Sequence, residues 1–313
     1  SFARHMSGKD VPAYEYGLVT KNGERLDAII APKLIKYEEE NAILGSRHYD
    51  RWLATEQRLR ERLQRLIHAE SVDEIALLKS TSEGLSVVAH GLRWSEGDEV
   101  VITSLEFPSN RIVWESLARY GVRVIKADIE NTDAPEQALI DAMGPRTRLL
   151  SVSSVQYSTG LRLDLARLGA ACRDRDLYFC VDAIQSVGAL PFDVQAVGAD
   201  FVMADGHKWM LGPEGLALFY CRRERRDALA LHQYGWHMVQ DVSDFNKKNW
   251  QPNETAQRFE CGSPNMTGIV ALHASVGLLL DIGMASVEKQ VMGNSAYLAN
   301  KLAALDNIEI LSP

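Results

Sequence analysis

The sequence predicts an α/β protein built on a largely parallel sheet with helices on both faces. Short apolar runs rich in Val, Ile and Leu alternate with helical stretches, which is typical of parallel strands joined by crossover helices. Turn-forming or polar residues follow most of these runs. The chain has 313 residues, of which 46% are hydrophobic and 24% charged. This is enough material for a sizeable core.

The alternating pattern begins after an N-terminal region. Residues 14–30 predict a hairpin around an Asn22-Gly23 turn. The hairpin weakly resembles the terminal strands of a PAS sensor domain, but it is too short to close a PAS pocket. An accessory hairpin or arm is the simpler interpretation. Leucines at helical spacing then predict an amphipathic helix over Ile35–Ala69. These leucines are Leu53, Leu59, Leu63 and Leu66.

The alternating region itself extends to Tyr220. Its predicted strands are Ile75–Leu78, Val100–Thr103, Arg123–Ala127, Leu149–Val152, Leu177–Val181, Phe201–Ala204 and Gly215–Tyr220. Its predicted helices are Gly84–Leu92, Asn110–Tyr120, Pro135–Met143 and Leu163–Arg175. Because ligands of such sheets bind at the carboxyl ends of the strands, the residues that follow each strand are the first candidates for a site.

The remainder of the chain predicts a helix from Thr267, a second helix over Ser286–Leu305 and a strand over Asn307–Leu311 that starts another unit. We therefore expect three regions. Residues 1–36 form an N-terminal arm, residues 37–285 form the large domain, and residues 286–313 begin a small C-terminal domain.

Charge and cysteine content exclude several classes of protein. The net charge of −8 is spread along the chain, which argues against nucleic acid or an anionic membrane as a partner. The four cysteines form no C-x-x-C pair and no Cys/His cluster, so we expect no metal site and no disulfide framework. Residues 1–10 contain no apolar stretch, and apolar runs such as Ile269–Leu280 are too short to span a bilayer. We expect a cytoplasmic protein.

Three segments at predicted strand ends supply the groups that pyridoxal phosphate needs. The cofactor requires a lysine for a Schiff base, an acid for its pyridine nitrogen and donors for its phosphate. Lys208 and Asp182 fit the first two roles. Thr81 and Ser82, before the helix near Gly84, fit the third, because a helix N-terminus favours an anion. Each residue alone has a simpler explanation as a cap, turn or solvated side chain. The argument therefore depends on the ordered set.

Two of these segments also carry a family resemblance. Val181–Gly188 reads VDAIQSVG, and Ala204–Gly215 reads ADGHKWMLGPEG. With them the chain, from about Glu39 to at least Leu305, resembles the class V aminotransferase family. These are fold type I pyridoxal-phosphate enzymes and include cysteine desulfurases, kynureninases and isopenicillin N epimerase. The resemblance implies that the large domain binds the cofactor and that the small C-terminal domain is incomplete here.

The resemblance assigns cofactor-binding roles position by position. It implies that Lys208 forms the Schiff base and that His207 lies near the phosphate. Asp182 would bind the pyridine nitrogen, and Gln185 would bond the ring hydroxyl. Phe107 would stack on the ring, where many desulfurases have His and kynureninases have Phe.

It also assigns substrate and partner roles. Gln156 and Tyr157 resemble a kynureninase segment near the substrate. Ser263 would reach the phosphate of a partner subunit, which implies a homodimer with a shared active site. The pattern departs from the family at Asp205, where desulfurases have a phosphate-binding Ser. The family's substrate-carboxylate Arg and the desulfurase Cys are expected beyond Pro313, and none of the four cysteines matches that Cys.

The sequence therefore predicts a pyridoxal-phosphate enzyme that acts at Cα or Cβ of an amino acid, as an aminotransferase or a cysteine desulfurase-like enzyme. A kynureninase-like C–C or C–S lyase and an amino-acid epimerase are the alternatives, slightly favoured by Phe107 and the segment 155–157. A nicotinamide-dependent dehydrogenase is excluded because no G-x-G-x-x-G follows the first strand. A non-catalytic sensor or binding module would leave Asp182 and Lys208 unexplained.

Overall fold

The computed structural model describes most of the chain and divides it into two units. The described residues are 15–19, 25–29, 34–37, 40–43, 46–242, 248–305 and 307–310. The first unit is Ser1–Gln57 and the second is Arg58–Pro313. The three predicted regions, with boundaries at 36/37 and 285/286, stay predictions.

The first unit contains two short antiparallel pairs and the beginning of a helix. Strands β1 (Glu15–Val19) and β2 (Arg25–Ile29) pair as the predicted hairpin requires, while its turn residues lie outside the described residues. Strands β3 (Leu34–Tyr37) and β4 (Glu40–Ile43) also pair. Helix α2 runs over Ser46–Leu66.

The helix predicted from Ile35 is therefore wrong in its first part. The leucines that carry the helical period begin only at Leu53. Before Ser46 the described backbone satisfies its hydrogen bonds across the pair β3–β4 instead. The amphipathic pattern is confirmed from Ser46 onward.

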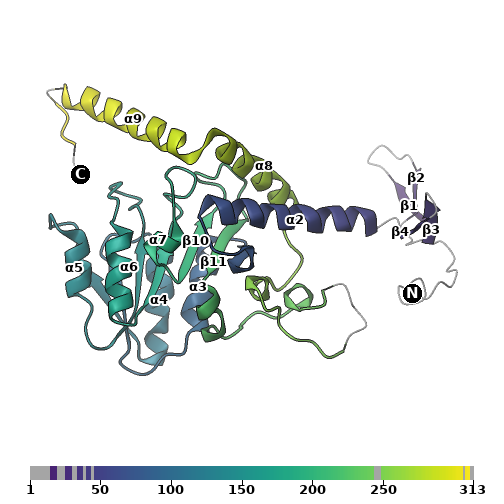
Figure 1. The fold of residues 1–313 in the computed structure, drawn as a ribbon, viewed down its shortest axis with the longest axis horizontal. Helices are drawn as coiled ribbons and strands as arrows, with labels where there is room; N and C mark the ends of the chain where they lie inside the picture. Colours follow the sequence, from purple (N-terminus) through teal and green to yellow (C-terminus); the bar gives the residue numbers. More distant parts are fainter. Residues whose placement is uncertain are drawn as a thin grey trace. The chain divides into compact units, whose positions relative to one another are not determined.

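A seven-stranded sheet in the order β5-β11-β10-β9-β8-β6-β7 forms the centre of the second unit (Figure 1). Its strands are β5 (Ile75–Leu78), β6 (Glu99–Thr103), β7 (Arg123–Ala127), β8 (Thr147–Ser153), β9 (Tyr178–Asp182), β10 (Phe201–Asp205) and β11 (Ala217–Cys221). Strand β11 is antiparallel to both neighbours, and the other pairs are parallel. All seven predicted strands are confirmed, because buried parallel strands read as continuous apolar runs.

Helices cover both faces of this sheet (Figure 1), as predicted. Successive residues of β5 alternate between two hydrophobic clusters, with Ile75 on one face and Ala76 on the other. Leu85 and Trp114 place α3 (Thr81–Gly91) and α4 (Ser109–Glu115) on the face of Ala76. The other face packs the second half of α2 and the helices α5 (Pro135–Asp141), α6 (Leu165–Asp174), α7 (Val194–Val197) and α8 (Met266–Ile282).

The last helix, α9 (Met284–Ala303), confirms the predicted tail helix. It meets α8 at Gly283 with a bend of 85°. In the described part of the chain, no single helix has the length and apolarity to cross a membrane, although this bent pair passes that test on length and composition. The strand predicted at Asn307–Leu311 is not formed over 307–310, where no described strand lies alongside to pair with it.

Candidate active site

The predicted site residues gather where parallel strands end. Strands β8, β9 and β10 are neighbours in register, with Ser153 opposite Asp182 and Asp182 opposite Met203. Because parallel strands end at the same edge, the segments that follow them lie together. The predicted residues at this edge are Thr81 and Ser82 after β5, Phe107 after β6, Gln156 and Tyr157 after β8, Asp182 and Gln185 at the end of β9, and His207 and Lys208 after β10.

Asp182 is a buried carboxylate without a bonded cation among the described residues. Its side chain is 2% exposed, and the amide of Ile184 donates to Oδ1 over 3.1 Å. Burial raises the pKa of Asp182 to about 7, and the negative charges of Glu106 and Asp205 add to this effect. A positively charged partner would relieve the cost of this buried anion. Asp182 therefore fits the protonated pyridine nitrogen of pyridoxal phosphate.

The N-terminus of α3 offers donors for a phosphate. Ser80 caps the helix, its Oγ accepting from the amide of Glu83 over 3.2 Å. Oγ1 of Thr81 is buried and finds no hydrogen-bond partner among the described residues. The exposed hydroxyl of Ser82 donates to Ser109 Oγ over 2.8 Å. An orphaned hydroxyl at a helix N-terminus fits an anionic group.

The contacts of Asp205 explain how an acidic residue fits where desulfurases have a phosphate-binding Ser. Its Oδ1 accepts a 3.2 Å hydrogen bond from the amide of Thr81, so the carboxylate occupies the first amide of α3. Burial raises the pKa of Asp205, while the hydrogen bond from the Thr81 amide and the charges of His207 and Lys208 act in the opposite direction. The Thr81 amide is therefore bonded within the protein and is not free for a phosphate.

Lys208 projects from a tight turn after β10. Within this turn the amide of Leu211 donates to the carbonyl of Lys208 over 3.2 Å, and that of Gly212 donates to the carbonyl of Gly206 over 2.8 Å. Lys208 is exposed and His207 is half-buried. An accessible ammonium at the end of the strand beside Asp182 fits the lysine that carries the cofactor.

Gly188 joins the segment after β9 to the Lys208 turn. Its backbone has a φ of +98°, and a Cβ at this position would lie 2.4 Å from the carbonyl oxygen of Trp209. A side chain here would force the two backbone segments apart. The close approach keeps the residues that follow Asp182 against those that follow Lys208.

We expect Gly188→Ala to lower the free energy of unfolding by about 2–4 kcal/mol and to weaken cofactor binding, because it combines left-handed strain with a backbone clash. The matched control is Gly160→Ala, since Gly160 has a φ of +74° with open space around it. In the control, the free energy of unfolding should fall by only about 1 kcal/mol. Urea unfolding measures both variants. Equal losses would show that the contact with Trp209 is not required.

The predicted aromatic and polar residues of the site differ in exposure. Phe107 and Tyr157 are 46% and 52% exposed and form an edge-to-face pair with ring centroids 5.2 Å apart. Gln185 is half-buried. Gln156 is buried, and its Oε1 has no hydrogen-bond partner among the described residues. Ser263 is exposed and lines a cavity of about 230 Å³ at the end of β5.

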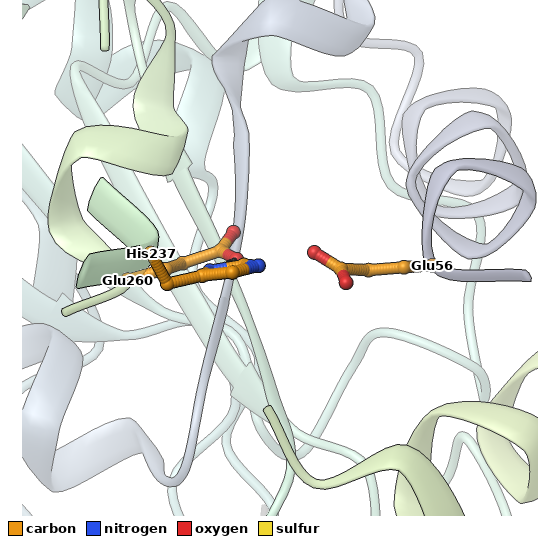
Figure 2. A group of neighbouring side chains, drawn as sticks. All are labelled: Glu56, His237 and Glu260. Atoms are coloured by element: carbon orange, nitrogen blue, oxygen red, sulfur yellow. Dashed lines mark ion pairs between the residues drawn. The ribbon is translucent and has the colours of Figure 1, made fainter. Parts of the chain in front are cut away.

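A buried ion pair fastens the segment that carries Ser263 to the sheet. Arg60 donates to both carboxylate oxygens of Glu260, at 2.8 and 2.6 Å, and the amide of Leu77 donates to the same carboxylate over 2.8 Å. His237 lies beside Glu260, with Nδ1 3.6 Å from Oε2 (Figure 2). Glu260 therefore ties this segment to β5 and α2, three residues before Ser263.

Glu106, for which the sequence predicted no role, lies at the centre of a buried hydrogen-bond network. Its carboxylate accepts from side chains of Thr103, Asn110, Ser153 and Gln156. The sequence feature that could have indicated a role for Glu106 was a carboxylate shortly after a buried strand. That signal was weak because a Glu in a loop is usually exposed to solvent.

A mostly parallel sheet with a buried acid, a lysine-bearing turn and a helix N-terminus at one edge defines a fold type I pyridoxal-phosphate enzyme. The chain belongs to the class V aminotransferase family, whose model matches residues 34–313. The predictions of fold class, family and cofactor are confirmed. The roles of individual site residues stay predictions.

Several known proteins are similar to this chain. A probable cysteine desulfurase of Methanothermobacter thermautotrophicus is 34% identical, with 87% of this chain and 68% of the relative covered. A cysteine desulfurase of Klebsiella pneumoniae is 30% identical, with 82% and 63% covered. The chain thus spans about two thirds of the length of these relatives.

Two solved structures are also similar to this chain. The cysteine desulfurase CsdA of Escherichia coli superposes with a TM-score of 0.74 at 25% identity, with 87% of this chain and 68% of the other covered. A cystine C-S lyase in complex with cysteine persulfide superposes with a TM-score of 0.77 at 25% identity, with 85% and 70% covered.

Proposed function

We propose that this chain binds pyridoxal phosphate through Lys208 and acts on a sulfur-containing amino acid, breaking its C–S bond. The observation that carries the proposal is the buried carboxylate of Asp182, which has no bonded cation among the described residues and lies on the strand next to the one that leads to Lys208. The activities of the similar proteins, cysteine desulfurases and a cystine C-S lyase, support the substrate class.

Each predicted residue has a task in this proposal. Lys208 holds the cofactor covalently and moves a proton at the substrate Cα once it is released. Asp182 keeps the ring nitrogen protonated, and Gln185 bonds the ring hydroxyl. Thr81, Ser82 and His207 bind the phosphate, while Phe107 packs on the ring. When bound, the cofactor supplies an electron-withdrawing ring that stabilises negative charge at Cα.

Three cysteines of the described chain are unsuited to act as a nucleophile. Burial raises the pKa of Cys172 to about 12 and raises those of Cys180 and Cys221 further. Such thiols are poor nucleophiles at neutral pH. Cys261 is half-buried and donates to Gln233 Oε1 over 3.2 Å. Of the described thiols, three are therefore unsuited to accept sulfur from a substrate.

One observation favours a second candidate, a kynureninase-like lyase. Phe107 and Tyr157 form a half-exposed aromatic pair at the substrate edge, a surface that suits an aromatic substrate side chain. Transamination and epimerisation would use the same cofactor-binding residues. Identification of the reaction products distinguishes these two reactions from C–S or C–C cleavage.

We expect purified protein loaded with pyridoxal phosphate to show a visible absorption band that borohydride bleaches. Incubation with cysteine, cystine, kynurenine and alanine should consume a sulfur-containing amino acid and release sulfide or persulfide. Release of anthranilate from kynurenine would favour the second candidate instead. Absence of the band at saturating cofactor would refute the proposed function.

The proposal includes a homodimer, with Ser263 reaching the partner's cofactor phosphate. Ser263 is exposed, and α8 presents an exposed apolar row, in which Val270, Leu278 and Ile282 are 52%, 54% and 51% exposed. Such a row suits an isologous interface. Sedimentation of the loaded protein tests this pairing. A cytoplasmic location, in keeping with four free cysteines, is also part of the proposal.

A further inference from the structure

Glu106 is a buried carboxylate surrounded by neutral donors. It follows β6 and is 6% exposed. Oε1 accepts from Thr103 Oγ1 at 3.0 Å and from the Ser153 amide at 2.9 Å. Oε2 accepts from Asn110 Nδ2 at 2.8 Å and from Ser153 Oγ at 2.5 Å. In every contact Glu106 is the acceptor, which is the geometry of an ionised carboxylate.

The surrounding side chains hold this carboxylate in place. Asn110 bonds Glu106 with its amide nitrogen, while its oxygen accepts from Ser151 Oγ at 2.7 Å and from Trp114 Nε1 at 2.9 Å. Gln156 adds a longer bond of 3.4 Å from Nε2 to Oε1 of Glu106. The network connects β6, α4 and β8, so Glu106 has little freedom to turn toward solvent.

Ser153 bridges Glu106 to the cofactor site. Both its amide and its hydroxyl donate to Glu106, and it lies opposite Asp182 in the β8–β9 register. Asp182 is thus next to a residue that directly holds Glu106. The charge of Glu106 contributes to the raised pKa of Asp182.

We propose that Glu106 is a positioning residue whose buried charge, two strands from Asp182 in the sheet order, keeps a proton between Asp182 and the ring nitrogen of pyridoxal phosphate. It does not contact the ring in this proposal; it acts through Asp182. A nearby negative charge favours the proton whether it resides on the acid or on the ring nitrogen. The inference rests on the proposed function, because it requires Asp182 to face that nitrogen.

Other titratable side chains near Asp182 also affect the proton between Asp182 and the ring nitrogen. Asp205 at the end of β10 adds a second negative charge, and the thiol of Cys180 lies two residues earlier on β9. The cations His207 and Lys208 act on Asp205. All hydrogen-bond donors to Glu106 among the described residues are neutral, so no bonded cation there offsets its charge.

Glu106→Gln removes this charge and keeps the shape of the side chain. We expect its dissociation constant for pyridoxal phosphate at pH 8, measured by fluorescence titration of the cofactor-free chain, to rise about tenfold. In the cofactor-free chain, the pH at which Asp182 titrates should fall by about one unit. The pH dependence of urea unfolding measures this midpoint without cofactor. Thr103→Val is the matched control, since it removes one donor to Glu106 and leaves the charge.

Two further variants separate a charge effect from a structural one. Glu106→Asp keeps the charge and should retain wild-type cofactor affinity within about threefold. In an Asp182→Asn background, Glu106→Gln should leave the dissociation constant unchanged, because an amide does not keep the ring nitrogen protonated and the charge of Glu106 then has no proton to act on. If Glu106→Gln does not fold, the Glu106→Asp result decides, and a loss of cofactor affinity of about tenfold or more in that variant overturns the proposal.

The outcomes also distinguish this inference from the proposed function. Failure of the wild-type chain to bind the cofactor would refute both. If the wild type binds the cofactor, and Glu106→Gln changes neither the dissociation constant nor the pH at which Asp182 titrates, only the role of Glu106 is refuted. An equal change in the dissociation constant on Glu106→Gln in the wild type and in the Asp182→Asn background would also refute only the role of Glu106.

Discussion

Lys208→Ala is expected to lose the borohydride-reducible bond to pyridoxal phosphate and all measurable turnover. The side chain supplies both the covalent attachment and the proton transfer at Cα, so no other described group replaces it. Because Lys208 is exposed on a turn held by backbone hydrogen bonds, the free energy of unfolding should change by less than about 0.5 kcal/mol. Absorbance, mass spectrometry after reduction and urea unfolding measure these three properties.

Lys79→Ala is the matched control for this prediction. Lys79 is also exposed, and it also follows a strand of the same sheet at its carboxyl end. Its substitution should keep the reducible bond and most of the turnover. A reducible bond that persists in Lys208→Ala and disappears in Lys79→Ala would assign the cofactor to the other lysine.

The sheet could be predicted from the sequence because six of its seven described strands are almost fully buried. Each of these reads as a largely apolar run, and a polar residue stands at or just after its end. The predicted site followed from the same feature. Asp182 and Lys208 stand directly after such runs, and parallel strands bring their ends to one edge.

What the sequence could not predict depends on contacts between distant residues. Glu106 and Ser153 are 47 positions apart, and only the pairing of β6 with β8 brings them within 2.5 Å. The pairing of β3 with β4 was missed because helical periodicity further along the chain was extended to residues that lack it. Likewise, no local pattern encodes the burial that raises the pKa of Asp182.

Asp182→Asn is expected to have opposite effects on stability and on function. In the cofactor-free chain, burial raises the pKa of Asp182 from an unfolded value of about 3.9 to about 7. The native state then binds more protons than the unfolded state between these values. Its stability therefore falls as pH rises from about 4 to about 7.

Removing this charge should make the cofactor-free variant more stable than the wild type at pH 8, by about 1–4 kcal/mol, and equal to it near pH 4. Turnover should fall at least about a thousandfold, about 4 kcal/mol in barrier, because an amide cannot keep the ring nitrogen protonated. Urea unfolding at both pH values and steady-state kinetics measure the two effects.

Asp200→Asn gives the contrasting case for a buried carboxylate that has cationic partners. Asp200 is 3% exposed and contacts Arg222 at 3.4 Å and Arg225 at 3.2 Å. Its substitution breaks these pairs, so it should destabilise the chain at pH 8 by about 1–3 kcal/mol. The two variants thus move stability in opposite directions at the same pH. If Asp182→Asn also destabilised the cofactor-free chain at pH 8, Asp182 would already have a favourable partner within the protein, and its assignment to the pyridine nitrogen would fail.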